Sequence, residues 1–149
     1  MYIFLFCGCF ASAQKTASNN PELAKKLLET FGLDAEMRGL ETRERLGTIN
    51  KILFLPGARN EHWHKNGVCT ITLDSQITDE AEMQFKAYHE IGHHFGLEHC
   101  PFCTYNIMTE YRSGKTYLFN EKPIRTLYLD LFFEAIRNPK KYNDGHSHY

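Results

Sequence analysis

The most informative stretch of the sequence is His89-Glu90-Ile91-Gly92-His93-His94-Phe95-Gly96-Leu97-Glu98-His99. His89 and His93 are four residues apart, so on a helix their imidazoles lie on one face, one turn apart, and both can reach one metal ion. Glu90 lies between them in the sequence. There its carboxylate can take a proton from a water molecule beside the metal without being a ligand itself.

The second half of this stretch supplies a third ligand. Gly96 is the type of residue that ends a helix in a left-handed turn, and the reversal of the chain would bring back His99. Three protein ligands and one open position are typical of a catalytic zinc, whereas structural zinc sites are closed by four ligands, usually including cysteine. The competing interpretation is a helix with ordinary surface histidines.

The stretch resembles the zinc-binding signature of the metzincin peptidases, H-E-x-x-H-x-x-G-x-x-H, at every fixed position. Metzincins also carry a methionine in a tight turn below the metal. Asn106-Ile107-Met108 follows His99 at a matching distance. The specific resemblance covers residues 79–112, and it is matrixin-like or archaemetzincin-like without assigning either subfamily. It implies that Met108 forms an apolar floor under the zinc ligands and that the substrate is a peptide.

The expected fold is α+β: a small twisted mixed β-sheet with packed helices, an active-site helix, and a short C-terminal subdomain with the methionine turn and a closing helix. Apolar spacing predicts a helix over 21–31 that ends at Gly32, and a buried strand over 51–55 that ends at Pro56-Gly57. Asp79 is a good N-cap for the histidine-bearing helix. Residues 123–138 read as the closing helix, and residues 146–149 as a frayed tail.

Residues 68–73 alternate apolar and small polar side chains, as in a half-buried strand. By resemblance this is the edge strand above the metzincin cleft, where Val68, Thr70 and Ile71 would pair with an extended substrate; the alternative is an ordinary internal strand. Tyr111 is expected as a wall of the specificity pocket or, alternatively, as a zinc contact. Tyr105 is a weaker candidate for the same roles.

The chain has 149 residues and a net charge of −1, which indicates one domain and gives no reason to expect nucleic acid as a partner. Residues 1–13 read as a signal peptide cleaved after Ala13, too short to span a bilayer. Residues 14–20 would form a flexible leader and 21–149 the catalytic domain. The alternatives are a lipid anchor at Cys9 and a buried N-terminal strand.

Three cysteines remain after residue 13: Cys69, Cys100 and Cys103. In an oxidising compartment an odd count implies one disulfide and one further thiol, and the pairing is not determined by sequence. One possibility is a bond from Cys69 to Cys100 or Cys103. Another is that a thiolate binds the zinc and holds the enzyme inactive.

Residues 58–67 are expected to form a loop that contains His62, Trp63 and His64. Two histidines around a tryptophan could bind a second metal ion or line a substrate cleft. The simpler alternative is an exposed loop anchored by Trp63.

Together these features predict a secreted or periplasmic zinc endopeptidase. Its zinc would be held by His89, His93 and His99, with Glu90 as the general base. Its partner would be a peptide or protein substrate, without stable membrane insertion. Two alternatives stay open, a catalytically silent zinc-binding or inhibitory module on the same scaffold and a zinc-dependent hydrolase of non-peptide amides.

Overall fold

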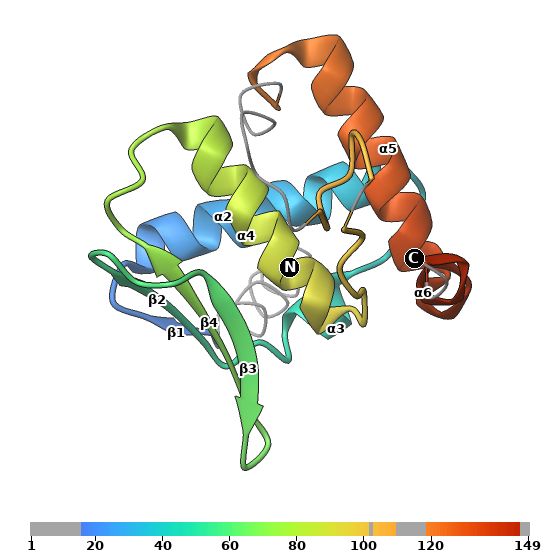
Figure 1. Ribbon diagram of the computed structural model, residues 1–149. Coiled ribbons are helices and arrows are strands. Elements are labelled where there is room, and N and C mark those ends of the chain that lie inside the picture. Colours follow the sequence, from blue (N-terminus) through green and yellow to red (C-terminus); the bar gives the residue numbers. More distant parts are fainter. Residues whose placement is uncertain (1–15, 102, 110–118, 147–149) are drawn as a thin grey trace, which may run out of the picture. The chain divides into compact units, whose positions relative to one another are not determined.

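The computed structural model describes residues 16–101, 103–109 and 119–146. The chain divides into two compact units, residues 1–74 and 75–149. The predicted α+β class is confirmed: the described residues form five helices and a four-stranded mixed sheet that does not close (Figure 1). None of the helices within those residues has the length and apolar character needed to cross a membrane.

The sheet belongs to the first unit and has the strand order β1-β2-β4-β3. β1 (Ala17–Ser18), β2 (Lys51–Leu55) and β4 (Val68–Asp74) run parallel, and β3 (Glu61–Lys65) is antiparallel to β4. β2 buries alternate residues, Ile52 and Phe54, as expected of a strand with one face in the core. The prediction of a strand over 51–55 is confirmed.

The predicted loop over 58–67 is wrong, because residues 61–65 form β3. A two-residue turn, Asn66-Gly67, joins β3 to β4, and both residues have positive φ, 53° and 77°. Positive φ at both central positions defines the type I′ turn, whose twist matches that of a β-hairpin. Figure 1 shows this hairpin at the end of the sheet, with β3 as the outer strand.

The expectation that residues 68–73 form the edge strand is also wrong. β4 lies between β2 and β3 and pairs with both, so Thr70 faces Lys51 on one side and Trp63 on the other. Its backbone groups are therefore already used within the sheet. Val68, Thr70 and Ile71 cannot receive a substrate strand in the way the edge interpretation required.

Residues 16–20 are ordered by specific hydrogen bonds, which overturns their interpretation as part of a flexible leader. The Ala17 amide donates to the Asn50 carbonyl at 2.8 Å. The Asn19 side chain donates to the Phe54 carbonyl at 2.7 Å and accepts from the Phe54 amide at 2.9 Å. Asn19 thus extends the pairing of the two-residue strand β1 with a side-chain amide.

The main helix of the first unit is α2 (Pro21–Glu36), which is capped by the Asn20 side chain. It continues past Gly32, where the sequence predicted its end, because a glycine in a helix interior costs only about 1 kcal/mol, which tertiary packing can outweigh. The left-handed residue after the helix is instead Gly39, with φ 77°. A short helix, α3 (Arg43–Leu46), precedes β2.

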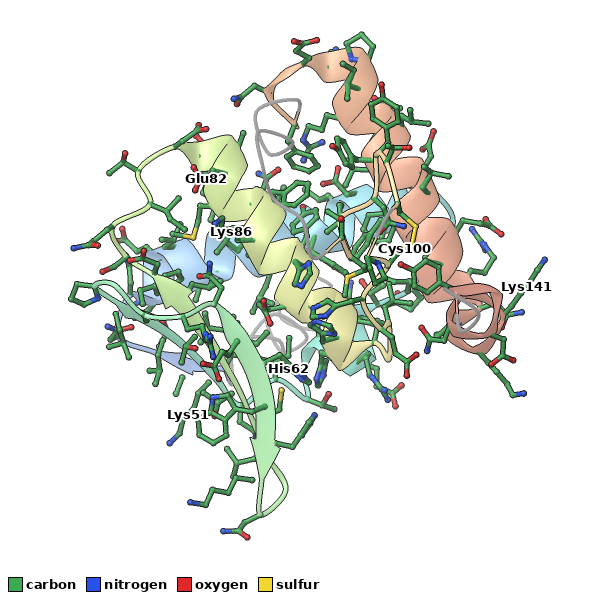
Figure 2. The ribbon with its side chains drawn as sticks, in the orientation of Figure 1. Lys51, His62, Glu82, Lys86, Cys100 and Lys141 are labelled. Carbon is green, nitrogen blue, oxygen red and sulfur yellow. A yellow bond between two sulfur atoms is a disulfide. The ribbon has the colours of Figure 1, made fainter. Side chains whose placement is uncertain are left out.

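The second unit contains three helices, α4 (Glu80–His94), α5 (Lys122–Arg137) and α6 (Pro139–His146). The predicted N-cap of α4 is confirmed, since the Asp79 carboxylate accepts from the Ala81 amide at 3.3 Å. An aromatic cluster joins α4 to α5, with Tyr88 stacked on Phe132 at a ring-centroid distance of 6.2 Å. A half-buried ion pair, Glu82 to Lys86, lies on another face of α4 (Figure 2).

Several predictions fall on residues that the structure does not describe. These are the signal peptide over 1–13, the lipid anchor at Cys9, the buried N-terminal strand, the role of Tyr111 and the last residues of the tail, 147–149.

Candidate metal site

The end of α4 has a turn geometry that determines where the chain goes next. Gly96 has φ 92°, its amide donates to the His93 carbonyl at 2.9 Å, and the Leu97 amide donates to the Gly92 carbonyl at 3.0 Å. This pair of bonds is the Schellman motif, which needs a left-handed residue at the Gly96 position. The predicted reversal at Gly96 is confirmed, and it returns the chain toward the helix face that carries the histidines.

Three imidazoles converge on one point beside α4. The Nε2 atom of His99 lies 3.2 Å from Nε2 of His89 and 3.1 Å from Nε2 of His93. The ligand atoms of all three residues lie within 4.8 Å of one another, close enough to hold a metal ion. His89 is buried, His93 is half-buried and His99 is exposed, so the group is open to solvent on the His99 side.

The other ring nitrogens of the two helical histidines bond to backbone carbonyls. Nδ1 of His89 lies 2.7 Å from the Ile107 oxygen, and Nδ1 of His93 lies 2.8 Å from the Leu97 oxygen. A carbonyl oxygen can only accept, so each Nδ1 carries the proton. In the neutral tautomer Nε2 then keeps its lone pair for a metal, an arrangement that recurs around metal-binding histidines.

The electrostatic setting favours uncharged imidazole at this point. Burial lowers the pKa of His93; the hydrogen bond with the Leu97 carbonyl opposes this effect, and the neighbouring His99 adds to it. Neutral imidazole is the form that binds metals. Glu90, the next residue after His89, is also buried, with only 4% of its surface exposed. A carboxyl group and three nitrogens close enough to hold a metal ion therefore come from one short segment.

Met108 lies against α4 at Gly92. A Cβ atom added to Gly92 would come within 2.6 Å of the Met108 sulfur and 2.9 Å of Cε1 of Phe132. Only a glycine allows this close approach. The turn that carries Met108 is held by Asn106, whose side-chain oxygen accepts from the Met108 amide at 2.7 Å.

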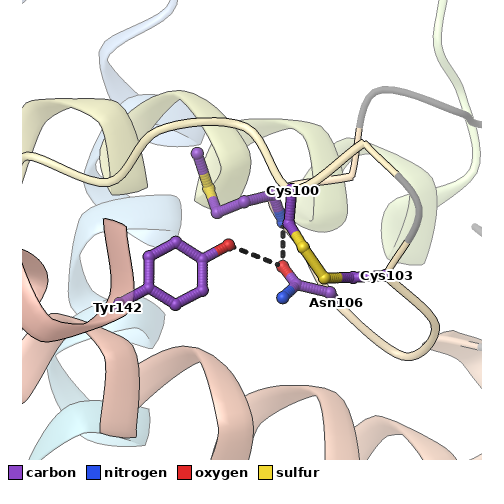
Figure 3. Close-up of a disulfide and its surroundings, with 5 residues drawn as sticks. Cys100, Cys103, Asn106 and Tyr142 are labelled. Atoms are coloured by element: carbon purple, nitrogen blue, oxygen red, sulfur yellow. Dashed lines mark hydrogen bonds between the residues drawn. A yellow bond between two sulfur atoms is a disulfide. The ribbon is translucent and has the colours of Figure 1, made fainter. Parts of the chain in front are cut away.

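A disulfide joins Cys100 to Cys103 within the loop between His99 and Met108 (Figure 3). The prediction of one disulfide is confirmed, but the pairing of Cys69 with either of these cysteines is wrong. Cys69 lies in β4, and burial raises the pKa of its thiol, while the Asn50 hydrogen bond and the Arg45 charge oppose this effect. The Cys100 amide also donates to the Met108 carbonyl at 2.9 Å, which closes the loop.

α6, which the sequence did not predict, anchors the turn after α4. The Asn143 side chain donates to the Gly96 carbonyl at 2.8 Å and accepts from the Glu98 amide at 2.9 Å. The hydroxyl of Tyr142 donates to the Asn106 side chain at 3.4 Å (Figure 3). Two neighbouring α6 residues thus hold both segments that follow the histidine-bearing helix. No periodic pattern in this polar segment indicates that role.

The three histidines predicted as metal ligands are therefore brought together. Asn143 and the carbonyls of Leu97 and Ile107 are the contributors that sequence reasoning missed. The direction of a backbone carbonyl depends on the conformation of the turn, so it cannot be predicted from the identity of the side chains.

Comparison of the chain with protein-family models, with curated proteins and with solved structures gives no significant match.

Proposed function

We propose that this protein is a zinc-dependent endopeptidase of metzincin type, with zinc held by His89, His93 and His99. The observation that carries the proposal is the convergence of the three Nε2 atoms. A tetrahedral zinc with Zn–N bonds of 2.0–2.1 Å needs nitrogens about 3.3–3.4 Å apart. The distances of 3.2 and 3.1 Å fit this requirement with only small shifts of the rings. Three nitrogens leave one position open for substrate.

Zinc, when bound, supplies a Lewis acid that stabilises negative charge on a carbonyl oxygen and makes a nearby water molecule more acidic. Glu90 then acts as the general base, since its carboxylate takes the proton from the attacking water. The same carboxyl group returns that proton to the nitrogen of the departing amine. The Ile107 and Leu97 carbonyls keep the two helical imidazoles in the tautomer that this role requires.

The order of elements after α4 supports the metzincin assignment within this proposal. The left-handed Gly96 follows the second histidine, and a methionine turn then packs under the same helix at Gly92. The disulfide between Cys100 and Cys103 supports a secreted or periplasmic location, since disulfides persist in oxidising compartments.

The test is cleavage of an unfolded protein by the full chain, loaded with zinc under non-reducing conditions. Glu90→Gln removes the base but leaves the three imidazoles. The expected result is a rate lower by about 10²–10⁴-fold, the usual contribution of a general base, with the zinc content per chain unchanged. Glu80→Gln is the matched control, because it makes the same chemical change at an exposed position in the first turn of α4. Its rate should equal that of the wild type.

Three outcomes would each contradict a part of the proposal. Equal rates for Glu90→Gln and wild type would remove Glu90 from the chemistry. An intact protein substrate after long incubation with the zinc-loaded wild type would point instead to a binding or inhibitory module. If only non-peptide amides were hydrolysed, the substrate class would be wrong.

A further inference from the structure

A second set of metal-binding side chains lies on the β3–β4 hairpin, in the first unit. In the antiparallel pairing His64 faces Cys69, and His62 faces Ile71. Alternate residues of a strand share a face, and directly paired residues share it too. His62, His64 and Cys69 therefore project from one face of the hairpin, and Trp63 projects from the other. Figure 2 labels His62 on this strand.

The ligand atoms of these three residues lie within 4.8 Å of one another. The two imidazole rings are 4.9 Å apart between centroids and nearly perpendicular, at 84°. A tetrahedral zinc needs nitrogens about 3.3–3.4 Å apart and a nitrogen-to-sulfur distance of about 3.6 Å. Side-chain rotations that bring the atoms closer by up to about 1.5 Å would meet those values.

We propose that His62, His64 and Cys69 form a second metal site, which binds zinc or a similar thiophilic transition-metal ion. Two imidazoles and a thiolate are ligands that select zinc or copper rather than magnesium or calcium. The burial gradient provides an entry path, since Cys69 is 1% exposed while His64 is exposed and His62 is half-buried. The ion enters from the histidine side and displaces the thiol proton.

The hairpin turn makes this arrangement specific. A shift of the strand pairing by one residue would move both histidines to the opposite face. The type I′ turn at Asn66-Gly67 fixes the register and so keeps His64 across from Cys69. A bound ion would in turn hold the outer strand β3 against β4. It would therefore raise the resistance of the hairpin to unfolding by mass action.

Cobalt(II) distinguishes this site from the one beside α4. A cobalt ion held only by imidazoles has no thiolate ligand, so a thiolate-to-cobalt charge-transfer band in the near ultraviolet reports the hairpin site alone. The full chain is titrated under non-reducing conditions, which keep Cys100 and Cys103 in their disulfide. The expected result is two cobalt equivalents, one of which develops the band and loses it when zinc is added.

Variants show which residues give rise to the near-ultraviolet charge-transfer band. His93→Gln should remove one equivalent and leave the band, whereas Cys69→Ser and His64→Gln should each remove the band and leave the other equivalent. His64 is exposed, so its substitution keeps the test valid if Cys69→Ser fails to fold. The variant that replaces Cys7, Cys9, Cys100 and Cys103 with serine is the control for the other cysteine sulfur atoms, and it should keep the band.

Trp63, the single tryptophan, gives an independent readout because it stands between the two histidines in β3. In the His93→Gln background, cobalt should quench its fluorescence with a stoichiometry of one, and His64→Gln should abolish the quenching. A wild-type chain that binds one cobalt without a near-ultraviolet band would overturn the proposal. A band that survives Cys69→Ser would do the same.

Discussion

Replacing Gly92 with alanine would place a methyl group between α4 and the turn that carries Met108. The added Cβ would lie 2.6 Å from the Met108 sulfur and 2.9 Å from Cε1 of Phe132. Non-bonded heavy atoms prefer separations of about 3.5–4.0 Å, so the neighbours must retreat by about 1 Å. Phe132 has little room to do so, because its ring packs on Tyr88 and Phe133. We therefore expect Met108 and its turn to move.

Two opposing effects set the size of the change in stability. Glycine to alanine in a helix interior stabilises by up to about 1 kcal/mol, whereas overpacking a dense core costs about 1–3 kcal/mol. The net expectation is a lower free energy of unfolding, by about 1 kcal/mol. Since Ile107, next to Met108, orients His89, zinc affinity should also fall by roughly 10-fold, the lower end of the range for such supporting contacts.

Urea unfolding of the metal-free protein measures the first effect, and competition with a chromophoric chelator measures the second. The matched control is Gly32→Ala, because Gly32 lies inside α2 and its nearest contact would be Leu46 Cδ1 at 4.0 Å. The free energy of unfolding of that variant should rise by up to about 1 kcal/mol, and its zinc affinity should stay unchanged. A double-mutant cycle with Met108→Ala should then show coupling of about 0.5–3 kcal/mol, because removing the Met108 side chain relieves the clash. A Gly92→Ala protein that is more stable than wild type, or energies that simply add, would refute this account.

Three further predictions concern the supports of the two sites. Asn143→Ala removes two hydrogen bonds to the turn after α4, so zinc affinity should fall by roughly 10-fold in chelator competition, whereas Asp144→Ala on the same helix should leave it unchanged. In Gly67→Ala the added Cβ meets no other atom, but Gly67 has φ 77°, which an alanine adopts only with strain. Urea unfolding should therefore show a free energy of unfolding lower by about 1 kcal/mol. An unchanged midpoint would contradict the turn assignment. Cys100→Ser/Cys103→Ser removes a disulfide between residues three positions apart. The free energy of unfolding should fall by about 2 kcal/mol, because the unfolded chain gains conformational entropy. Equal stability of the wild type with and without reductant would argue against the disulfide.

The histidine-bearing helix could be predicted because its signals are local. The Asp79 cap, the spacing of His89 and His93, and the left-handed turn at Gly96 each involve residues within a few positions of one another. Such features depend on the geometry of a single helix and its ends. These features can therefore be predicted from the local sequence without knowledge of the rest of the fold.

The outer strand β3 shows why the sheet was harder. Four of its five residues are exposed, so it has no alternation of apolar and polar side chains for a periodicity argument to find. The available signal was Asn66-Gly67, the most favourable pair for a type I′ hairpin turn. Without that strand, β4 was assigned to the edge, and Val68, Thr70 and Ile71 were given a substrate role that its inner position excludes.

Side-chain hydrogen bonds explain the other differences. Asn19 and Asn143 hold, respectively, the first strand and the turn after α4 by pairing with backbone groups far away in the sequence. An asparagine in a polar segment usually indicates a turn or a cap. Nothing in its local sequence distinguishes it from one that bonds to a segment 35 or 45 residues away.

The two helical histidines of the candidate metal site depend on the fold to different extents. His93 is oriented by the Leu97 carbonyl, four residues away, within the same turn that ends the helix. His89 is oriented by the Ile107 carbonyl, 18 residues away, so its ring position depends on the loop that the disulfide, Asn106 and the methionine turn hold. Changes in that loop should therefore act on metal affinity through His89, while the orientation of His93 stays a local property of the α4 terminus. On this reasoning we expect the methionine and the disulfide to affect metal affinity without being ligands, because they hold the loop whose Ile107 carbonyl orients the His89 imidazole.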